Sequence, residues 1–147
     1  MDVGYSLIGG SETALTTIFR TKGRTPDKLN AMLGDMAMHR EIHRVDNRAK
    51  EMIEAITLDF DLPLGAVADA DMDHPILQKM TPTALAGSSR TGTVLMLLNA
   101  GAFHAEICRL SREHCHPLFG SSANRTLQGT KFRVEDIEPE ISAVAAV

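Results

Sequence analysis

The chain has 147 residues, of which 44% are hydrophobic and 23% are charged, and its formal net charge is −4. These values predict one domain over residues 1–147 with a real core, and they exclude a fibre or a disordered tail. The negative charge argues against binding of nucleic acid by a generally basic surface, although basic residues are concentrated in 20–28 and 40–50. No apolar run reaches the roughly 20 residues of a membrane helix, and the N-terminus lacks a secretory pattern. We therefore expect a cytoplasmic protein without a membrane partner.

Three helices are predicted in the first part of the chain. Ser11 is the expected N-cap of the first helix, which runs into the basic TKGR. Thr25 and Pro26 predict the cap and first turn of a short second helix. A third helix is predicted from about Met38 to Ile56. The predicted apolar faces are Ala14, Leu15, Ile18 and Phe19 in the first helix, Leu29, Met32 and Leu33 in the second, and Ile42, Val45, Ala49, Met52, Ile53 and Ile56 in the third.

The remainder of the chain favours strands and short helices. Prolines and glycines interrupt residues 58–89, which predicts loops and short strands there. The apolar run TVLMLL, residues 93–98, predicts a strand buried on both faces. Residues 102–112 predict a helix that packs on this strand through Phe103, Ile107 and Leu110, and HPLFGSS predicts another short strand. A strand, a helix and a strand in this order favour an α/β architecture. A short helix is expected after Glu135.

Two polar motifs are candidates for a binding site. Lys22 and Arg24 follow the end of the first predicted helix, where two cations can converge on one anion, although a helix C-terminus also attracts cations through its dipole. In GSSANRT, residues 120–126, the small polar residues permit a tight turn. The same residues can form a polar lip that holds a phosphate or a nucleotide through Ser121, Ser122 and Asn124. Local pattern alone does not decide between these readings.

The two motifs in this order resemble the signature of the YrdC-like family, the threonylcarbamoyl-AMP synthases of tRNA modification. The matching residues are Lys22, Arg24, Ser122 and Asn124. GYSLIGGSETALTTIFRTKGR is similar to the family's PTDTVYGL segment and first helix, and HPLFGSSAN is similar to the strand that leads to its SAN turn. VEDI, residues 134–137, is similar to the start of the helix that follows the turn. The resemblance extends from Asp2 to about Ile141, with a loosely matching middle.

The resemblance implies a twisted, mixed sheet flanked by helices, the YrdC-like (DHBP synthase-like) fold, with a basic cleft. It also implies a nucleotidyltransferase that takes ATP, L-threonine and bicarbonate, releases pyrophosphate, and leaves threonylcarbamoyl-AMP for transfer to tRNA with a partner protein. Lys22 and Arg24 would be catalytic in an electrostatic sense, neutralising charge that develops at adenylation. Ser121, Ser122 and Asn124 would contact the nucleotide or the adenylate. Mg²⁺ would enter as a complex with the ATP phosphates.

Several positions depart from the family pattern. Val3 stands where the second threonine of PTDT is expected, so one hydroxyl contact is lost. Leu97 and Asn99 stand where the family's central strand has an Arg-x-Pro, so a triphosphate contact is missing or has moved to Arg90. We also expect an incomplete fold, without the strand before PTDT and without the segments after VEDI. Its open sheet edges would permit oligomers.

Other sites are less favoured. His104, Cys108, His114, Cys115 and His116 match no usual zinc spacing, and we expect Cys108 to be a core residue and both cysteines to be thiols. The acidic DADMDH, residues 69–74, lacks the glycine and distal glutamate of a calcium loop and predicts a solvated loop. No base is placed to activate either cysteine as a nucleophile.

Three functional hypotheses follow. The first is a threonylcarbamoyl-AMP synthase-like enzyme. The second is a catalytically degenerate module of the same fold that binds a nucleotide or double-stranded RNA. The third is a subunit whose open sheet edges are covered by another chain.

Overall fold

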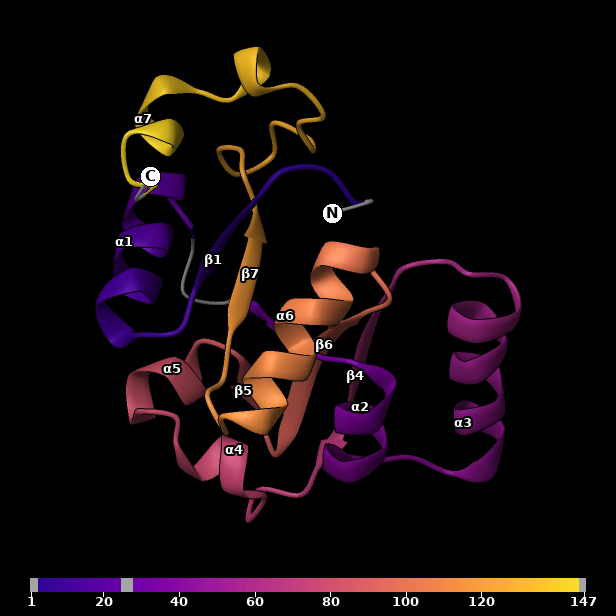
Figure 1. The fold of residues 1–147 in the computed structure, drawn as a ribbon. Coiled ribbons are helices and arrows are strands. Elements are labelled where there is room, and N and C mark those ends of the chain that lie inside the picture. Colours follow the sequence, from indigo (N-terminus) through magenta and orange to yellow (C-terminus); the bar gives the residue numbers. More distant parts are fainter. Residues whose placement is uncertain (1–2, 25–27, 146–147) are drawn as a thin grey trace.

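The computed structural model describes residues 3–24 and 28–145. Within these residues one mixed sheet has the strand order β1-β7-β2-β6-β4-β3, with β5 paired to β6 (Figure 1). The strands are β1 (Ser6–Gly9), β2 (Ala31–Leu33), β3 (His43–Arg44), β4 (Leu64–Ala70), β5 (Ser89–Arg90), β6 (Thr93–Leu98) and β7 (Phe119–Ser122). The β2–β6 pair is parallel and the other pairs are antiparallel. The prediction of an α/β fold with a mixed sheet is confirmed.

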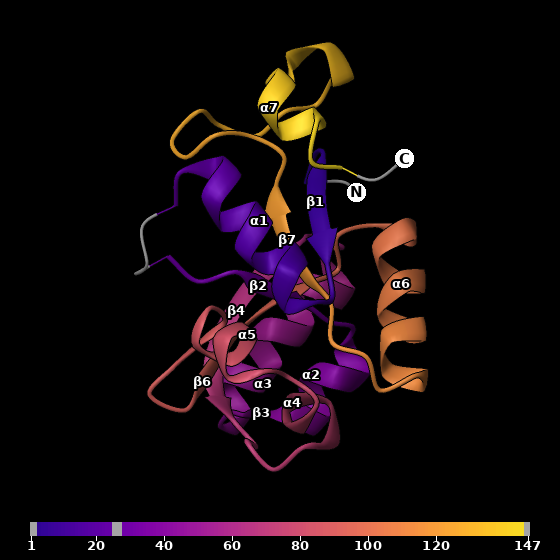
Figure 2. The same ribbon diagram turned by 90° about the vertical axis from the view of Figure 1, so that its left-hand side faces the viewer.

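Helices flank both sides of this sheet. They are α1 (Glu12–Lys22), α2 (Met36–Ile42), α3 (Asn47–Glu54), α4 (Pro75–Gln78), α5 (Pro82–Ala86), α6 (Ala102–Glu113) and α7 (Pro139–Ser142), with a π-helical turn η1 (Ala55–Asp59) and a 3₁₀ turn η2 (Val134–Asp136). Figure 2 shows α1 and α6 on opposite sides of β1. None of the described helices is long and apolar enough to cross a membrane.

Helix α1 forms as its sequence predicts. The Ser11 side chain accepts a hydrogen bond from the Ala14 amide at 3.1 Å, which satisfies one of the free donors of the first turn. Leu15 and Ile18 are buried. Gly23, with φ 58°, ends the helix in the left-handed region that glycine adopts without steric cost.

The predicted second helix is wrong in its described part. Thr25 and Pro26 lie outside the described residues, and Ala31–Leu33 forms strand β2. Met32 pairs with Met96 of β6 and with Phe119 of β7, and its side chain is fully buried. Pairing with two strands that are distant in sequence therefore overrides the local helical pattern.

The predicted helix over 38–56 is divided into two. Helix α2 ends at Ile42, residues His43–Arg44 pair with β4, and α3 begins after Asp46, whose side chain caps the Ala49 amide at 2.8 Å. Helix α3 has no fully buried residue, and Met52 is exposed. The apolar pattern in 38–56 is therefore shared by α2, the short strand β3, α3 and the first residues of η1.

Strand β6 is the centre of the core, but only one of its faces is fully buried. Val94, Met96 and Leu98 are completely inaccessible, while the alternate residues are half-buried. The prediction of burial on both faces is thus corrected. Buried residues on surrounding elements complete this core, namely Leu15, Met32, Met38, Ile42, Ala66, Ile76, Leu77, Ala84 and Phe119.

Helix α6 is present, but it presents the opposite face to the sheet from the one predicted. Its buried residues are His104, Cys108 and Ser111, whereas Phe103 is 61% exposed and Leu110 is 39% exposed. The Cys108 side chain lies 3.5 Å from the Nε2 atom of His104, and the Ser111 hydroxyl donates to the His116 carbonyl at 2.6 Å. The buried polar side chains have local partners, so their burial is tolerated.

The interrupted segment 58–89 contains more regular structure than predicted. It holds the seven-residue strand β4 and the short helices α4 and α5 besides loops. In the acidic loop after β4, the Arg44 guanidinium forms an ion pair with the Asp71 carboxylate. The Nε2 atom of His74 lies 3.4 Å from a carboxylate oxygen of Glu41. The short helix expected after Glu135 is α7, which packs against α1.

Candidate functional site

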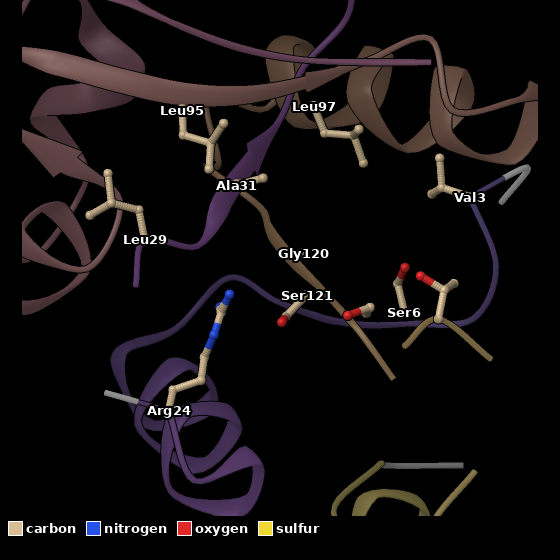
Figure 3. A pocket seen from close by; sticks show the side chains of 11 residues that line it. Val3, Ser6, Arg24, Leu29, Ala31, Leu95, Leu97, Gly120 and Ser121 are labelled. Carbon is tan, nitrogen blue, oxygen red and sulfur yellow. The ribbon is translucent and has the colours of Figure 1, made fainter. Parts of the chain in front are cut away.

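A cavity of about 270 Å³ lies where strands β2, β6 and β7 meet the end of α1 (Figure 3). Its lining consists of Val3, Ser6, Arg24, Leu29, Ala31, Leu95, Leu97, Gly120, Ser121, Ser122 and Thr130. The half-buried face of β6 therefore forms one wall of this cavity. Residues from both sequence motifs, Arg24 on one side and Ser121 and Ser122 on the other, share it.

Arg24 is the cationic residue among the described lining residues. Its side chain points into the cavity between Leu29 and Ser121 (Figure 3). The Nη1 atom donates a hydrogen bond to the Oδ1 atom of Asn30, and the guanidinium carbon lies 5.6 Å from the centre of the Phe19 ring. Burial lowers the pKa of Arg24, but a guanidinium stays charged at neutral pH. The cavity is thus supplied with a fixed positive charge that is partly shielded from water.

Lys22 lies beside the polar turn and contacts its backbone, not the cavity. Its side chain is only 4% exposed, and its Nζ atom donates to the Ser122 carbonyl and, at 2.6 Å, to the Asn124 carbonyl. Burial, with a smaller contribution from Arg24, lowers the pKa of Lys22 to about 8, and Glu138 opposes this effect. The two motifs therefore meet in space, but the Lys22 ammonium is occupied by backbone oxygens and is not part of the described cavity lining.

Asn124 is likewise buried and lies outside the described lining. Its Nδ2 atom donates to the Arg125 carbonyl at 2.6 Å, while its Oδ1 atom has no hydrogen-bond partner among the described residues. Thr126 ties the turn to α1, because both its amide and its hydroxyl donate to the Lys22 carbonyl, at 3.2 and 2.9 Å. Lys22, Asn124 and Thr126 together fix the conformation in which Ser121 and Ser122 face the cavity.

Asn30 is a site residue that sequence reasoning missed. It is 1% exposed, its amide donates to the Gly87 carbonyl at 2.8 Å, and its Oδ1 atom accepts from Arg24. Its Nδ2 atom is buried and has no partner within the described part of the chain. The only signal in the sequence was an asparagine shortly after the basic motif, which does not distinguish a positioning residue from a turn residue.

Apart from Arg24 and the hydroxyl-bearing residues, the described lining is apolar. Val3 and Leu97, the two departures from the family pattern, both line the cavity, together with Leu29 and Leu95. Asn99 lies elsewhere, with φ 50°, and its Nδ2 atom donates to the Thr57 carbonyl and the Asp61 carboxylate, each at 3.0 Å. Arg90 is on β5 and is not in the described lining, so nothing in that lining replaces the arginine expected at 97.

This combination of groups can bind an anion but offers little for acid–base chemistry. A guanidinium and several hydroxyls are the polar side chains of the described lining, which contains no histidine, carboxylate or cysteine. A serine nucleophile needs an adjacent base. The cavity also supplies no carboxylate for Mg²⁺, so the ion would have to arrive with a phosphate ligand.

The alternative metal and cysteine sites gain no support. Among the described residues, no three histidine, cysteine or acidic side chains lie close enough to hold a metal ion. Cys108 is a core residue, as predicted, and burial raises the pKa of its thiol to about 12. Such a thiol is unreactive near neutral pH.

The fold is shared with known structures, although no family model and no curated protein sequence matches the chain. The hypothetical protein smu.1377c from Streptococcus mutans is similar with a TM-score of 0.80 and 19% identity, over 98% of this chain and 56% of that one. Sua5 from P. abyssi, complexed with L-threonine, is similar with a TM-score of 0.56 and 20% identity, over 84% of this chain and 33% of that one. A P. abyssi Sua5 variant gives a TM-score of 0.58 at 18% identity, over 88% and 35% of the two chains.

These likenesses show a YrdC-like fold. The chain spans about half the length of the Streptococcus mutans protein and about a third of Sua5. At these identities the shared property is the fold, and the chemistry of the site has to be argued from the residues of this chain.

Proposed function

We propose that this chain is a YrdC-like domain and that Arg24 binds an anionic group of a substrate or product of threonylcarbamoyl-AMP synthesis. This group is a nucleotide phosphate or an amino-acid carboxylate. The observation that carries this proposal is the convergence of Arg24, Ser121 and Ser122 on one cavity. A guanidinium supplies paired donors for a carboxylate or phosphate, and the serine hydroxyls add donors beside it. The likeness to an L-threonine complex of Sua5 supports the same ligand class.

Synthase activity is the second candidate, and the shared fold is what favours it. In that reaction the threonine amine condenses with bicarbonate to give a carbamate and water. The resulting carbamate attacks the α-phosphate of ATP, and pyrophosphate leaves. Arg24 would stabilise charge that develops on the reacting oxygens. A tRNA would receive the product through a partner protein.

The composition of the cavity favours binding over efficient turnover. Val3 and Leu97 offer neither a hydroxyl nor a cation to a triphosphate. The Lys22 ammonium is held by the Ser122 and Asn124 carbonyls, so its use by a ligand would require the turn to rearrange. We therefore expect the chain to bind its ligand with measurable affinity and to release pyrophosphate slowly or not at all.

Calorimetry with Mg²⁺·ATP, AMP and L-threonine tests the binding proposal. Arg24→Ala should weaken the bound ligand about tenfold or more, because a charge-assisted contact of about 1.5–3 kcal/mol is lost. Arg20→Ala is the matched control, since Arg20 is in the last turn of α1, close to Arg24 in sequence, and is exposed. Absence of binding by all three ligands, or equal affinities in both variants, would show that the cavity is not this site.

A pyrophosphate-release assay separates the two candidates. Release that requires both L-threonine and bicarbonate indicates the synthase. Binding without release indicates the degenerate module, and a parallel titration with double-stranded RNA tests the remaining ligand class of that hypothesis.

A further inference from the structure

Strand β1 lies at one edge of the sheet, and among the described residues only one side of its backbone is paired. It pairs antiparallel with β7 and, within the described residues, with no other strand. In the view of Figure 2 this strand stands at the front of the molecule, between α1 and α6. An exposed sheet edge offers a row of unsatisfied donors and acceptors to a further strand.

The register identifies the residues whose backbone groups face outward. The Ala123 amide donates to the Tyr5 carbonyl at 2.8 Å, so Tyr5 is a hydrogen-bonded position of the β1–β7 ladder. Such positions alternate along an antiparallel pair, and Leu7 and Gly9 are therefore also bonded to β7. The amides and carbonyls of Ser6 and Ile8 consequently point away from the sheet.

A groove of about 490 Å³ follows this edge. Ser6, Leu7 and Ile8 line it from β1, Ala14, Thr17 and Ile18 from α1, Phe103 from α6, and Val144 and Ala145 from the segment after α7. None of these described lining residues carries a charge. Two large apolar side chains of this lining are exposed, Phe103 at 61% and Ile8 at 37%.

The chemistry of the groove restricts its occupant. The occupant must present extended backbone to Ser6 and Ile8, and it must be uncharged where it meets the groove. Strand β1 itself, with the sequence SLIG, meets both conditions. A second copy of the chain therefore offers the same surface that it requires, as an interface related by a twofold axis does.

We propose that two copies of this chain associate through antiparallel pairing of their β1 strands about a twofold axis at Leu7. In this register Ser6 of each copy pairs with Ile8 of the other. The amides and carbonyls of these two pairs form four hydrogen bonds, and the two Leu7 residues lie opposite each other without bonding. The two sheets join into one, and the α6 helices approach each other through the stripe that contains Phe103 and Ile107.

The charges on α6 permit this approach. Arg109 is bonded to Glu106 at 2.6 Å and to Glu113 at 2.5 Å, beside the apolar stripe. These ion pairs neutralise most of the charge on the flank of the helix, so that two copies do not repel each other strongly.

Sedimentation equilibrium over a wide range of protein concentration tests the proposal. We expect a monomer–dimer equilibrium in the unmodified chain, weakened at least tenfold by Ile8→Lys, which places a charge on the edge, and by Phe103→Asp. Phe60→Asp is the matched control, because Phe60 is also a strongly exposed phenylalanine but does not line the groove. Circular dichroism of each variant separates loss of the dimer from loss of the fold.

Amide hydrogen exchange gives a second readout that is specific to the register. The amides of Ser6 and Ile8 should exchange more slowly as the protein concentration rises, while the amide of Leu7, already bonded to β7, should change less. A monomer at every concentration overturns the proposal, and so does a dimer that Ile8→Lys and Phe103→Asp leave unchanged. A monomer that binds an extended peptide along β1 also overturns it, in favour of a different occupant.

Discussion

Acidification should destabilise the fold through a pair of buried histidines. His39 and His43 are 1% and 4% exposed, and their Nδ1 atoms lie 2.9 Å apart. The Nε2 atom of His43 lies 3.1 Å from the Val94 carbonyl. A carbonyl only accepts, so His43 carries its proton on Nε2 and accepts at Nδ1 from His39. A second proton on His43 would place two donors face to face and break the bond.

The size of the effect follows from the pKa of His43. Burial, followed by the neighbouring His39, lowers this pKa from 6.5 to about 4, and the bond to Val94 opposes the change. Burial, followed by the charge of Arg40, also lowers the pKa of His39, and Glu54 opposes this change. Because the unfolded chain binds a proton near pH 6.5 and the folded chain does not, stability falls as the pH drops from about 6.5 to about 4. The His43 contribution is about 2 kcal/mol at pH 5 and about 3 kcal/mol when complete.

Urea unfolding of the unmodified chain and of His43→Gln at pH 7.5 and pH 5 measures this contribution. Glutamine can donate and accept without titrating in this range, so the loss of stability between the two pH values should shrink by about 2 kcal/mol. His114→Gln, at an exposed position, is the control and should keep the full loss. Equal pH dependence in His43→Gln and the unmodified chain would refute the role of this pair.

Three further predictions concern the turn, the core and the thiols. Lys22→Met leaves the Ser122 and Asn124 carbonyls without their buried donor, so chemical unfolding should show a loss of about 2 kcal/mol; unchanged stability would mean that water replaces the ammonium. Gly34→Ala places a Cβ 2.6 Å from the Cγ atom of fully buried Met96 and should cost about 1–3 kcal/mol. Gly65→Ala, whose nearest neighbour is Leu95 Cδ1 at 3.8 Å, should cost less, and a reversed order would contradict the packing. A thiol reagent at pH 8 should modify Cys115 well before Cys108, because burial raises the pKa of Cys108 to about 12; simultaneous modification in the folded state would contradict its burial.

The parts of the candidate site differ in how far the sequence predicts them. Lys22, Arg24 and the small polar turn could be chosen from residue types and order, and the structure places them around the end of α1. That Arg24 reaches the cavity while Lys22 binds the Ser122 and Asn124 carbonyls could not be predicted, because both cations lie close together at the end of the same helix. Asn30 could not be predicted as a site residue, because its role depends on burial beside Arg24 and no local sequence pattern indicates that burial.

The amino-acid sequence by itself determined the features that depend on neighbours along the chain. These include the cap of α1 at Ser11, strand β6, and the order of strand, helix and strand that makes the fold α/β. Only the tertiary structure decided that Ala31–Leu33 is a strand, that α6 turns its Phe103 stripe outward, and that Val3 and Leu97 share a cavity with Arg24. The physical reason is the distance along the chain between the residues that interact. Caps and turns are settled by hydrogen bonds within a few residues, whereas strand pairing and the choice of a buried face depend on segments that meet only after the chain has folded.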